Sequence, residues 1–422
     1  MLPLLLFLAV PMLGFIVAMK DLRRWESILI FILTYTLYGF ATSFELDTAD
    51  SYRIAQRFYY GVWHVDRIMT NYVSGEYTDL YRFFVYAFVQ QYTMNPKVLY
   101  AVFSFIYSIF VCLSLTQFYI VWKGKKTVFF YLLVFLAFVH ISFFNIQTTR
   151  YYTASAVFIY FTIQLLYFDR KLALIGICTT PFIHFSFFFG IAVIISYKFF
   201  VRTSRFSKYC YWFYVGAIIL SLAKPQTWID DTMGDEEEQE EMTSSSSINR
   251  KIKTYSKTTK NNGPKVDSGK ERSAYSQGRS AFKKVTGILY TWGLFLMCTI
   301  FYKKRMKKQL KQDETQAELQ NFIYYFLGAT TLFMLFFSNA GRFRQTCDAI
   351  LMFWICSVFV QNVSVRWKDY VIILLPIKLY QISFFFFNAP RHCDPMFWWA
   401  TPISTIIKGI DFVPPFLGNG FY

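Results

Sequence analysis

The sequence is poor in charged residues for its length. Only 16% of its 422 residues are Asp, Glu, Lys or Arg, whereas about 25% is usual in a soluble protein. The charges lie in short clusters between long apolar runs, and 55% of all residues are hydrophobic. Runs of about 17–25 apolar residues can cross a membrane as helices. Because these runs do not alternate apolar with polar residues, they predict an all-α, polytopic transmembrane helical bundle and not a membrane barrel.

The signatures of several kinds of chemistry are also missing. The chain has no Walker loop, no dinucleotide-binding glycine pattern and no Gly-x-Ser-x-Gly elbow, which argues against ATP-driven, redox and serine-hydrolase mechanisms. Its seven cysteines include no Cys-x-x-Cys pair and its four histidines show no metal-ligand spacing. We therefore expect no disulfide framework, no metal and no other cofactor. The net charge of +17 comes from basic residues between the apolar runs, as in cytoplasmic loops of membrane proteins, and does not indicate nucleic-acid binding.

The apolar runs predict a single membrane domain, 1–422, that crosses the bilayer about 11–13 times. The predicted segments are 2–18, 26–43, 98–122, 127–144, 151–168, 171–200, 209–223, 284–302, 320–338, 344–362 and 369–387. No basic residue precedes the first segment and no small-residue cleavage site follows it, so it is interpreted as a retained helix.

Basic residues cluster in alternate connections, and cytoplasmic loops of membrane proteins are rich in Lys and Arg. With these clusters placed in the cytoplasm, three long regions are predicted to lie outside. The loop 44–97 is expected to contain amphipathic helices. The loop 223–283 has acidic, serine-rich and basic stretches, which predict disorder. The tail 388–422 is expected to be extracytoplasmic or interfacial.

The segment 171–200 is the exception to this alternation, because both of its flanks are basic. The segment must therefore enter the membrane and return on the same side. Pro181 interrupts helical hydrogen bonding near its middle, so we expect a pair of short helices or a re-entrant hairpin, with His184 near the apex. Irregular backbone at membrane depth requires cover from protein or water, which predicts that His184 faces a cavity on the outer side.

Three arginines stand at predicted outer boundaries of membrane segments, against the usual distribution of positive charge. Arg150 follows Asn145 in a short outer turn, and Arg342 and Arg344 begin a later segment. An arginine at this depth needs a partner or a wet cavity, although a lone one can also snorkel toward lipid headgroups. A guanidinium binds phosphate oxygens in a bidentate manner, so the three arginines are candidates for binding a lipid-linked pyrophosphate.

Further polar candidates open the first outer loop. At helical spacing Asp50, Arg53 and Arg57 share one face, with Tyr52 beside them. This pattern suits either a surface ion-pair ladder or a carboxylate that takes a proton from a sugar hydroxyl. Lys378 lies inside a predicted membrane segment, where lysines are usually paired and functional.

Four short motifs occur in an order and spacing similar to those of a known family. They are Asp50-Ser51-Tyr52, Arg150-Tyr151-Tyr152-Thr153-Ala154-Ser155-Ala156, Ile183-His184-Phe185-Ser186 and Arg342. The pattern resembles the EpsG-type family of polysaccharide polymerases, relatives of the Wzy O-antigen polymerases, over roughly 30–200 and more weakly 320–390. The loop 223–283 has no counterpart in that family.

The resemblance implies a glycosyltransferase of C-type architecture in the bacterial inner membrane. In such enzymes the donor and the acceptor are both oligosaccharide units linked to undecaprenyl pyrophosphate. The enzymes join these units at the periplasmic face to make O-antigen, capsule or exopolysaccharide. A flippase and a chain-length regulator are then expected partners. Arg150, Arg342 and Arg344 would stabilise the departing pyrophosphate, and His184 or Asp50 would act as the base. Further candidates for substrate binding are Tyr52, Arg53, Asn145 and Lys378.

Three other functions fit parts of the same pattern. An O-antigen ligase would use similar membrane segments and a related reaction at the outer face. A transporter or flippase of lipid-linked sugars would show internal repeats and a site at the membrane midplane, whereas this sequence has no evident repeat. A membrane O-acyltransferase would place its intramembrane histidine toward a cytoplasmic acyl donor, and His184 is predicted on the opposite side.

Overall fold

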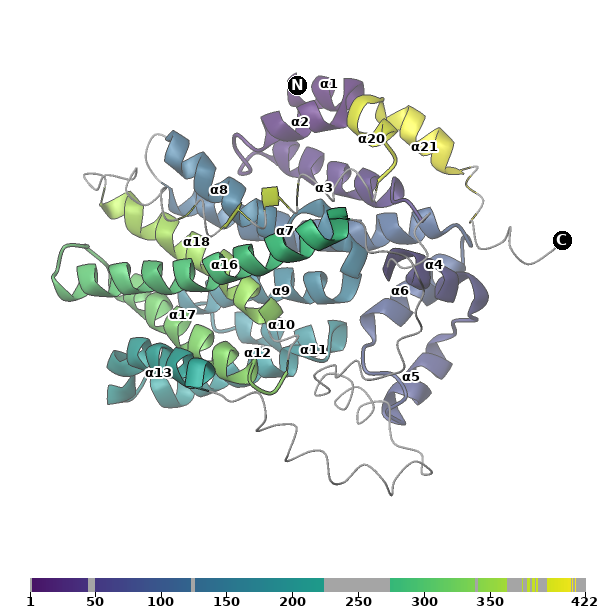
Figure 1. Ribbon diagram of the computed structural model, residues 1–422. Helices are drawn as coiled ribbons and strands as arrows, with labels where there is room; N and C mark the ends of the chain where they lie inside the picture. The colour runs from purple at the N-terminus through teal and green to yellow at the C-terminus, as the bar shows by residue number, and fades with distance from the viewer. Residues whose placement is uncertain are drawn as a thin grey trace. The chain divides into compact units, whose positions relative to one another are not determined.

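The computed structural model of the protein describes residues 2–44, 50–122, 126–223, 274–337, 341–362 and 393–410, together with 374, 378, 379, 382, 383, 385, 412 and 414. Within these residues all extended regular elements are helices (Figure 1), and the β pairing is limited to one isolated bridge between Thr42 and Cys393. The all-α prediction is therefore confirmed for the part of the chain that the structure describes.

Four helical stretches among the described residues are long and apolar enough to cross a membrane. They are Pro96–Val121, Val128–Leu166, Arg205–Ala223 and Gly341–Val360. Three shorter apolar helices accompany them, namely Trp25–Phe40, Ala173–Ile183 and Phe187–Val201. These helices are typical of a helical membrane protein, as predicted. Most of the predicted segment 369–387 lies outside the described residues.

The chain divides into two compact units. The first unit contains residues 1–191, 352–360 and 383–422, and the second contains residues 192–351 and 361–382.

Three successive helices form the centre of the first unit. They are α7 (Pro96–Val121), α8 (Val128–His140) and α9 (Thr149–Leu166), with a short 3-10 helix, η1 (Phe143–Thr148), between the last two. α8 runs antiparallel to α7, because Phe130 near its start contacts Tyr119 near the end of α7. At the other end, the Tyr107 hydroxyl donates to the carbonyl of Ser142. The turn expected at 144–151 is thus present and carries the start of α9.

The prediction of one membrane-crossing helix over 2–18 is wrong. The structure has two eight-residue helices there, α1 (Leu2–Ala9) and α2 (Pro11–Ala18), separated by extended backbone at Val10. Pro11 begins α2 and cannot donate to the preceding turn. The two helices pack closely, since a Cβ atom on Gly14 would overlap the backbone of Phe7. A helix of eight residues is only about 12 Å long and cannot cross a hydrocarbon layer of about 30 Å.

The described part of the region 44–97 contains three helices. They are α4 (Asp50–Tyr60), α5 (Val65–Val73) and α6 (Tyr81–Gln90). α4 forms because its apolar residues recur at helical spacing. Its buried side includes Ile54 and Phe58, and the Phe58 ring lies 5.6 Å from that of Tyr86 on α6. The opposite side of α4 is left to its charged residues.

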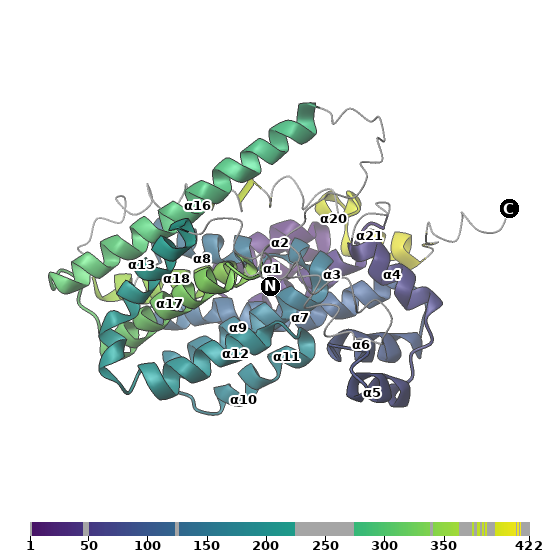
Figure 2. The ribbon, with the colours of Figure 1, turned by 60° about the horizontal axis from the view of Figure 1, so that its bottom comes forward.

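The chain reverses direction within 171–191, inside the segment 171–200 for which the charge pattern predicted a return (Figure 2). The helices here are α10 (Ala173–Cys178), α11 (Thr180–Ile183) and α12 (Phe187–Ser196). α10 packs on the later half of α9 at Phe161. His184 then contacts Tyr151 near the start of α9, and the first turns of α12 return to Phe158.

The reversal does not lie at the proline. Pro181 occupies the first turn of α11, where its missing N–H has no helical partner to lose. The helix ends instead at His184, whose backbone is extended (φ −150°, ψ 116°). His184 is therefore at the break, as expected, although Pro181 does not cause it.

The second unit is built around α13 (Cys210–Ala223), α16 (Ala274–Met306) and α17 (Glu314–Phe333). Gly328 of α17 lets α13 approach, because a Cβ atom there would overlap the ring of Phe213. α16 begins ten residues before the predicted start of its segment, within the region for which disorder was predicted. The rest of that region, 224–273, lies outside the described residues.

The final described helices belong to the first unit. They are α20 (Met396–Trp399) and α21 (Pro402–Ile410). α21 packs on α3 (Trp25–Phe40), where Gly409 closely approaches the ring of Phe40. Its opposite side exposes a stripe of isoleucines, Ile403, Ile406, Ile407 and Ile410. This amphipathic pattern is typical of a helix that lies along a membrane surface.

Candidate anion-binding site

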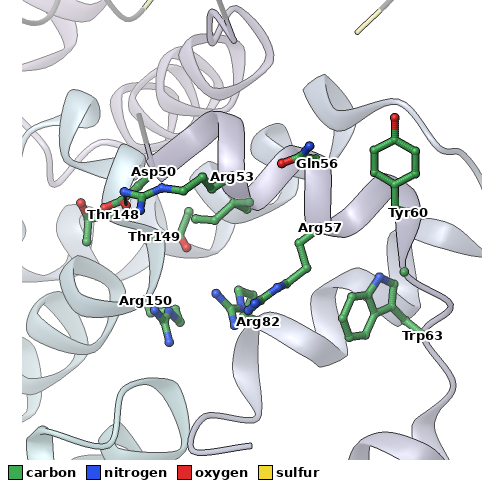
Figure 3. Close-up of a pocket in the computed structure, with 12 residues that line it drawn as sticks. Asp50, Arg53, Gln56, Arg57, Tyr60, Trp63, Arg82, Thr148, Thr149 and Arg150 are labelled. Carbon is green, nitrogen blue, oxygen red and sulfur yellow. Dashed lines mark hydrogen bonds and ion pairs between the residues drawn. The ribbon is translucent and has the colours of Figure 1, made fainter. Parts of the chain in front are cut away.

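A cavity of about 660 Å³ in the first unit brings together residues from three separate parts of the chain (Figure 3). α4 supplies one wall, the start of α6 a second, and the junction of η1 with α9 a third. Its charged and hydroxyl-bearing residues include Asp50, Arg53, Arg57, Arg82, Thr149 and Arg150. Asp50, Arg53 and Arg57 do share one face of a helix, as their spacing predicted.

Two of the four arginines are paired with carboxylates. Arg53 lies 2.7 Å from Asp50, and both side chains are largely exposed. Arg150 forms an ion pair with Asp79, which is only 1% exposed. The Arg150 side chain remains 27% exposed and lines the cavity. One guanidinium nitrogen of Arg150 is thus committed to Asp79, while the group as a whole offers five N–H donors.

The other two arginines have no ion pair with any carboxylate of the described residues. Figure 3 shows the side chain of Arg57 extending toward that of Arg82. Arg82 is 8% exposed, and its Nε has no hydrogen-bond partner among the described residues. Its guanidinium lies 4.7 Å from the centre of the Phe83 ring. Burial lowers the pKa of Arg82 to about 10, Tyr86 and Asp79 oppose this shift, and the positive charges of Arg150 and Arg57 add to it.

A buried hydroxyl adds a donor to this positive wall. Thr149 is 1% exposed, lines the cavity and has no hydrogen-bond partner for its Oγ among the described residues. Buried polar groups normally have partners. The four arginines carry four positive charges, and the carboxylates of Asp50 and Asp79 balance two of them. Two positive charges are therefore in excess, and the Thr149 hydroxyl adds a hydrogen-bond donor without a partner in the described part of the chain. The cavity is therefore suited to an anion with several oxygens.

Asp79 connects the cavity to the helix break at His184. One oxygen of Asp79 pairs with Arg150, and the other accepts a hydrogen bond from the backbone N–H of Phe185 at 2.9 Å. The next residue along, Leu80, donates its N–H to the carbonyl of Phe182, also at 2.9 Å. The segment before α6 is therefore hydrogen-bonded to the chain on both sides of the helix break, at Phe182 and at Phe185.

His184 lies beside the cavity wall and is not one of the residues that line the cavity. It is 8% exposed and packs edge-on against Tyr151. Its Nδ1 lies 2.7 Å from the Ser186 hydroxyl and 3.3 Å from the Ser186 backbone nitrogen. Because a backbone N–H can only donate, Nδ1 acts as an acceptor, which places the proton of a neutral ring on Nε2.

The predicted site residues divide into three groups. Asp50, Arg53 and Arg150 line the cavity. Tyr52, Asn145 and His184 belong to the first unit but do not line the cavity. Arg342, Arg344 and Lys378 belong to the second unit. Asn145 donates its amide to the carbonyl of His140 at 2.6 Å, so it satisfies the end of α8.

The second-unit candidates have partners of their own. Arg344 donates to the hydroxyl of Thr291 at 2.8 Å and is almost fully buried. Lys378 and Asp348 form an ion pair in which neither side chain has any exposed surface. Arg342 stands in the first turn of α18 (Gly341–Gln361).

Several residues at or beside the cavity were not among the predicted site residues, including Arg57, Arg82, Thr149 and Asp79. Arg57 was recognised only as part of the charged face of α4. Asp79 and Arg82 carried a usable signal, because they are the only charged residues between Tyr77 and Gln91. A charge within such an apolar stretch needs a partner or a ligand. Thr149 had no comparable signal.

Comparison with known proteins adds no relative. No family model, no curated protein and no solved structure matches this chain.

Proposed function

We propose that the protein is a polysaccharide polymerase that transfers a growing glycan from its lipid pyrophosphate carrier to a second lipid-linked repeat unit. The observation that carries this proposal is the concentration of arginines around one cavity, where Arg57 and Arg82 have no carboxylate partner among the described residues. Excess buried positive charge is costly without a counter-charge. A pyrophosphate supplies that charge with several oxygens, each able to accept from a guanidinium.

The cavity has the size expected for such a substrate. Ligand sites commonly enclose about 300–1,000 Å³, and this cavity of about 660 Å³ lies within that range. Trp63 and Tyr60 line the cavity as well. The ring of Trp63 packs against Phe83 and Tyr86, whereas that of Tyr60 is exposed, so Tyr60 is the aromatic group that could stack on the adjoining sugar.

The proposed reaction is a single displacement at the anomeric carbon of the donor. The hydroxyl oxygen of the acceptor sugar bonds to that carbon while the bond from the carbon to the pyrophosphate oxygen breaks. The electron pair leaves with the pyrophosphate, whose growing charge is stabilised by Arg82 and Arg150. The hydroxyl proton passes to a carboxylate, and we assign this role to Asp50 because it lines the cavity.

The undecaprenyl carrier, the bacterial inner membrane and the periplasmic orientation are parts of the same proposal. They are supported by the family resemblance of the motifs at Asp50, Arg150 and His184. The apolar helices support membrane residence alone.

Purified protein in lipid nanodiscs, supplied with a defined lipid-pyrophosphate-linked repeat unit, tests this function. We expect products longer than one unit from the wild type, and none from Arg82→Ala or Arg150→Ala. Arg67→Ala is the matched control, because Arg67 is an exposed arginine on α5 that does not line the cavity. Absence of elongation by the wild type would contradict the proposal. Transfer of preformed polymer to a different lipid acceptor would instead indicate a ligase.

A further inference from the structure

Asp79 is a buried carboxylate that touches the candidate site without entering it. It is 1% exposed, and it does not line the cavity. Its two oxygens contact groups that are distant in sequence, the Arg150 guanidinium and the Phe185 N–H. A carboxylate that accepts charge-assisted hydrogen bonds from two different segments fixes the distance between them.

We infer that Asp79 is a positioning residue, which holds the Arg150 guanidinium at the cavity and ties it to the helix break at His184. The inference rests on the proposed function, because it concerns the arginine that would bind the departing pyrophosphate. Asp79 itself does not line the cavity and lies outside the four sequence motifs.

The geometry explains why such an anchor is needed. An arginine side chain has about 2 kcal/mol of rotamer entropy to lose when it is fixed. Arg150 is at the start of α9 and 27% exposed, so a wet cavity alone would leave it free to change rotamer. With one nitrogen held by Asp79, the Arg150 guanidinium is kept at the cavity that it lines. A ligating group that is displaced by about 1 Å can lose about 100-fold in rate.

The backbone beside Asp79 also holds the segment before α6 against the helix break. Leu80, next to Asp79, donates to the carbonyl of Phe182 on the preceding side of the break. The hydrogen bond that Asp79 accepts from Phe185 and the one that Leu80 donates to Phe182 therefore flank His184. A shift of Asp79 would move Arg150 and the backbone at His184 together, which couples two positions that the motifs place 34 residues apart.

Binding of inorganic pyrophosphate to purified full-length protein in nanodiscs distinguishes positioning from simple charge. Asp79→Asn removes a negative charge beside Arg150, so electrostatics alone would tighten pyrophosphate binding. If Asp79 positions Arg150, the substitution should instead weaken pyrophosphate binding. We expect a loss of about tenfold in affinity, because a charge-assisted hydrogen bond to Arg150 is lost. Asp66→Asn is the matched control, since Asp66 is an exposed carboxylate on α5, and we expect it to bind as the wild type does.

A double-mutant comparison tests whether Asp79 acts through Arg150. In an Arg150→Ala background, we expect Asp79→Asn to change pyrophosphate binding by less than about twofold, because no guanidinium remains to be positioned. Asp79→Glu keeps the charge and lengthens the side chain, and we expect intermediate binding. This second variant also serves if Asp79→Asn does not insert into the membrane.

The outcomes separate the two proposals. If the wild type binds no pyrophosphate, or Arg150→Ala binds it as the wild type does, the proposed function fails and the inference falls with it. If both behave as proposed but Asp79→Asn binds pyrophosphate equally well or more tightly, only the positioning role is overturned. The positioning role is also overturned if Asp79→Asn lowers pyrophosphate affinity equally in the wild type and in the Arg150→Ala background.

Discussion

Arg57 and Arg82 line the same cavity, and neither has an ion pair with a carboxylate among the described residues. Arg57 is exposed to solvent, whereas Arg82 is 8% exposed. The charge of Arg57 repels that of Arg82, and Arg82 is poorly solvated because it is buried. The ligand-free cavity therefore stores an unfavourable electrostatic energy that a bound anion would relieve.

We expect Arg82→Met to raise the thermal stability of the ligand-free protein. Burial lowers the pKa of Arg82 to about 10, below the value of about 12.5 in an unfolded chain. The unfolded state thus binds the proton more tightly, so stability rises with pH between about 10 and 12.5, and the full cost is present at neutral pH. Removing the charge should raise Tm by about 2–4 °C. Arg67→Met, an exposed change, should leave Tm unaltered.

Measuring Tm in the presence of pyrophosphate tests whether the Arg82 charge is the cause of the lower stability. A ligand that binds the native state raises Tm, so pyrophosphate should stabilise the wild type and have little effect on Arg82→Met. A lower Tm for ligand-free Arg82→Met would show that the Arg82 charge is already compensated within the protein, and the cavity would then hold no excess positive charge for an anion to neutralise.

We expect Asp50→Asn to separate catalysis from binding. The Asp50–Arg53 ion pair is exposed, so its loss should change stability by less than about 1 kcal/mol. Loss of a general base should lower kcat for elongation by about 10²–10⁴-fold. Pyrophosphate binding should be retained or slightly tightened, because a negative charge leaves the cavity.

Kinetics of His184→Gln provide the comparison for Asp50. His184 does not line the cavity, so its loss should affect kcat less than Asp50→Asn does. A larger loss from His184→Gln than from Asp50→Asn would transfer the role of base to the histidine.

The charge pattern predicted a reversal within 171–200, because both flanks of that segment are basic. Its place at His184 was inferred from Pro181, which the structure puts in the first turn of α11. The broken segment at 2–18 was harder to predict. Its composition suits a membrane helix, and only Pro11 signals the interruption. The four-arginine cavity was predicted in part. The spacing of Asp50, Arg53 and Arg57 reports their shared helical face, whereas the contact of Asp79 with Arg150 joins residues that are 71 positions apart. No local pattern encodes a pairing of that kind.

Gly39 lies at a close contact between helices of the first unit, and we expect Gly39→Ala to destabilise the protein. A Cβ atom on Gly39 of α3 would overlap the backbone carbonyl of Tyr100 on α7 and the side chain of Ser104. Overpacking of this kind typically costs about 1–3 kcal/mol. Gly216→Ala on α13 is the matched control, because nothing lies within 4 Å of the added atom. Thermal unfolding of both variants tests the packing, and equal Tm values would contradict it.

The ion pair between Lys378 and Asp348 is expected to be structural. Both side chains are fully buried, so a substrate has no exposed surface of Lys378 to contact. Lys378→Met leaves Asp348 charged and unpaired, which should destabilise the protein by about 3–5 kcal/mol and reduce its yield in the membrane. The double variant Lys378→Met with Asp348→Leu replaces both charges with apolar groups and should recover the yield.

Elongation by this double variant decides between a structural and a functional role for the pair. If Lys378 only neutralises Asp348, the double variant should elongate glycans at close to the wild-type rate, because no group that lines the cavity of the first unit has changed. A variant that inserts and unfolds like the wild type but makes no polymer would instead return Lys378 to the substrate-binding role predicted for it from its depth in a membrane segment.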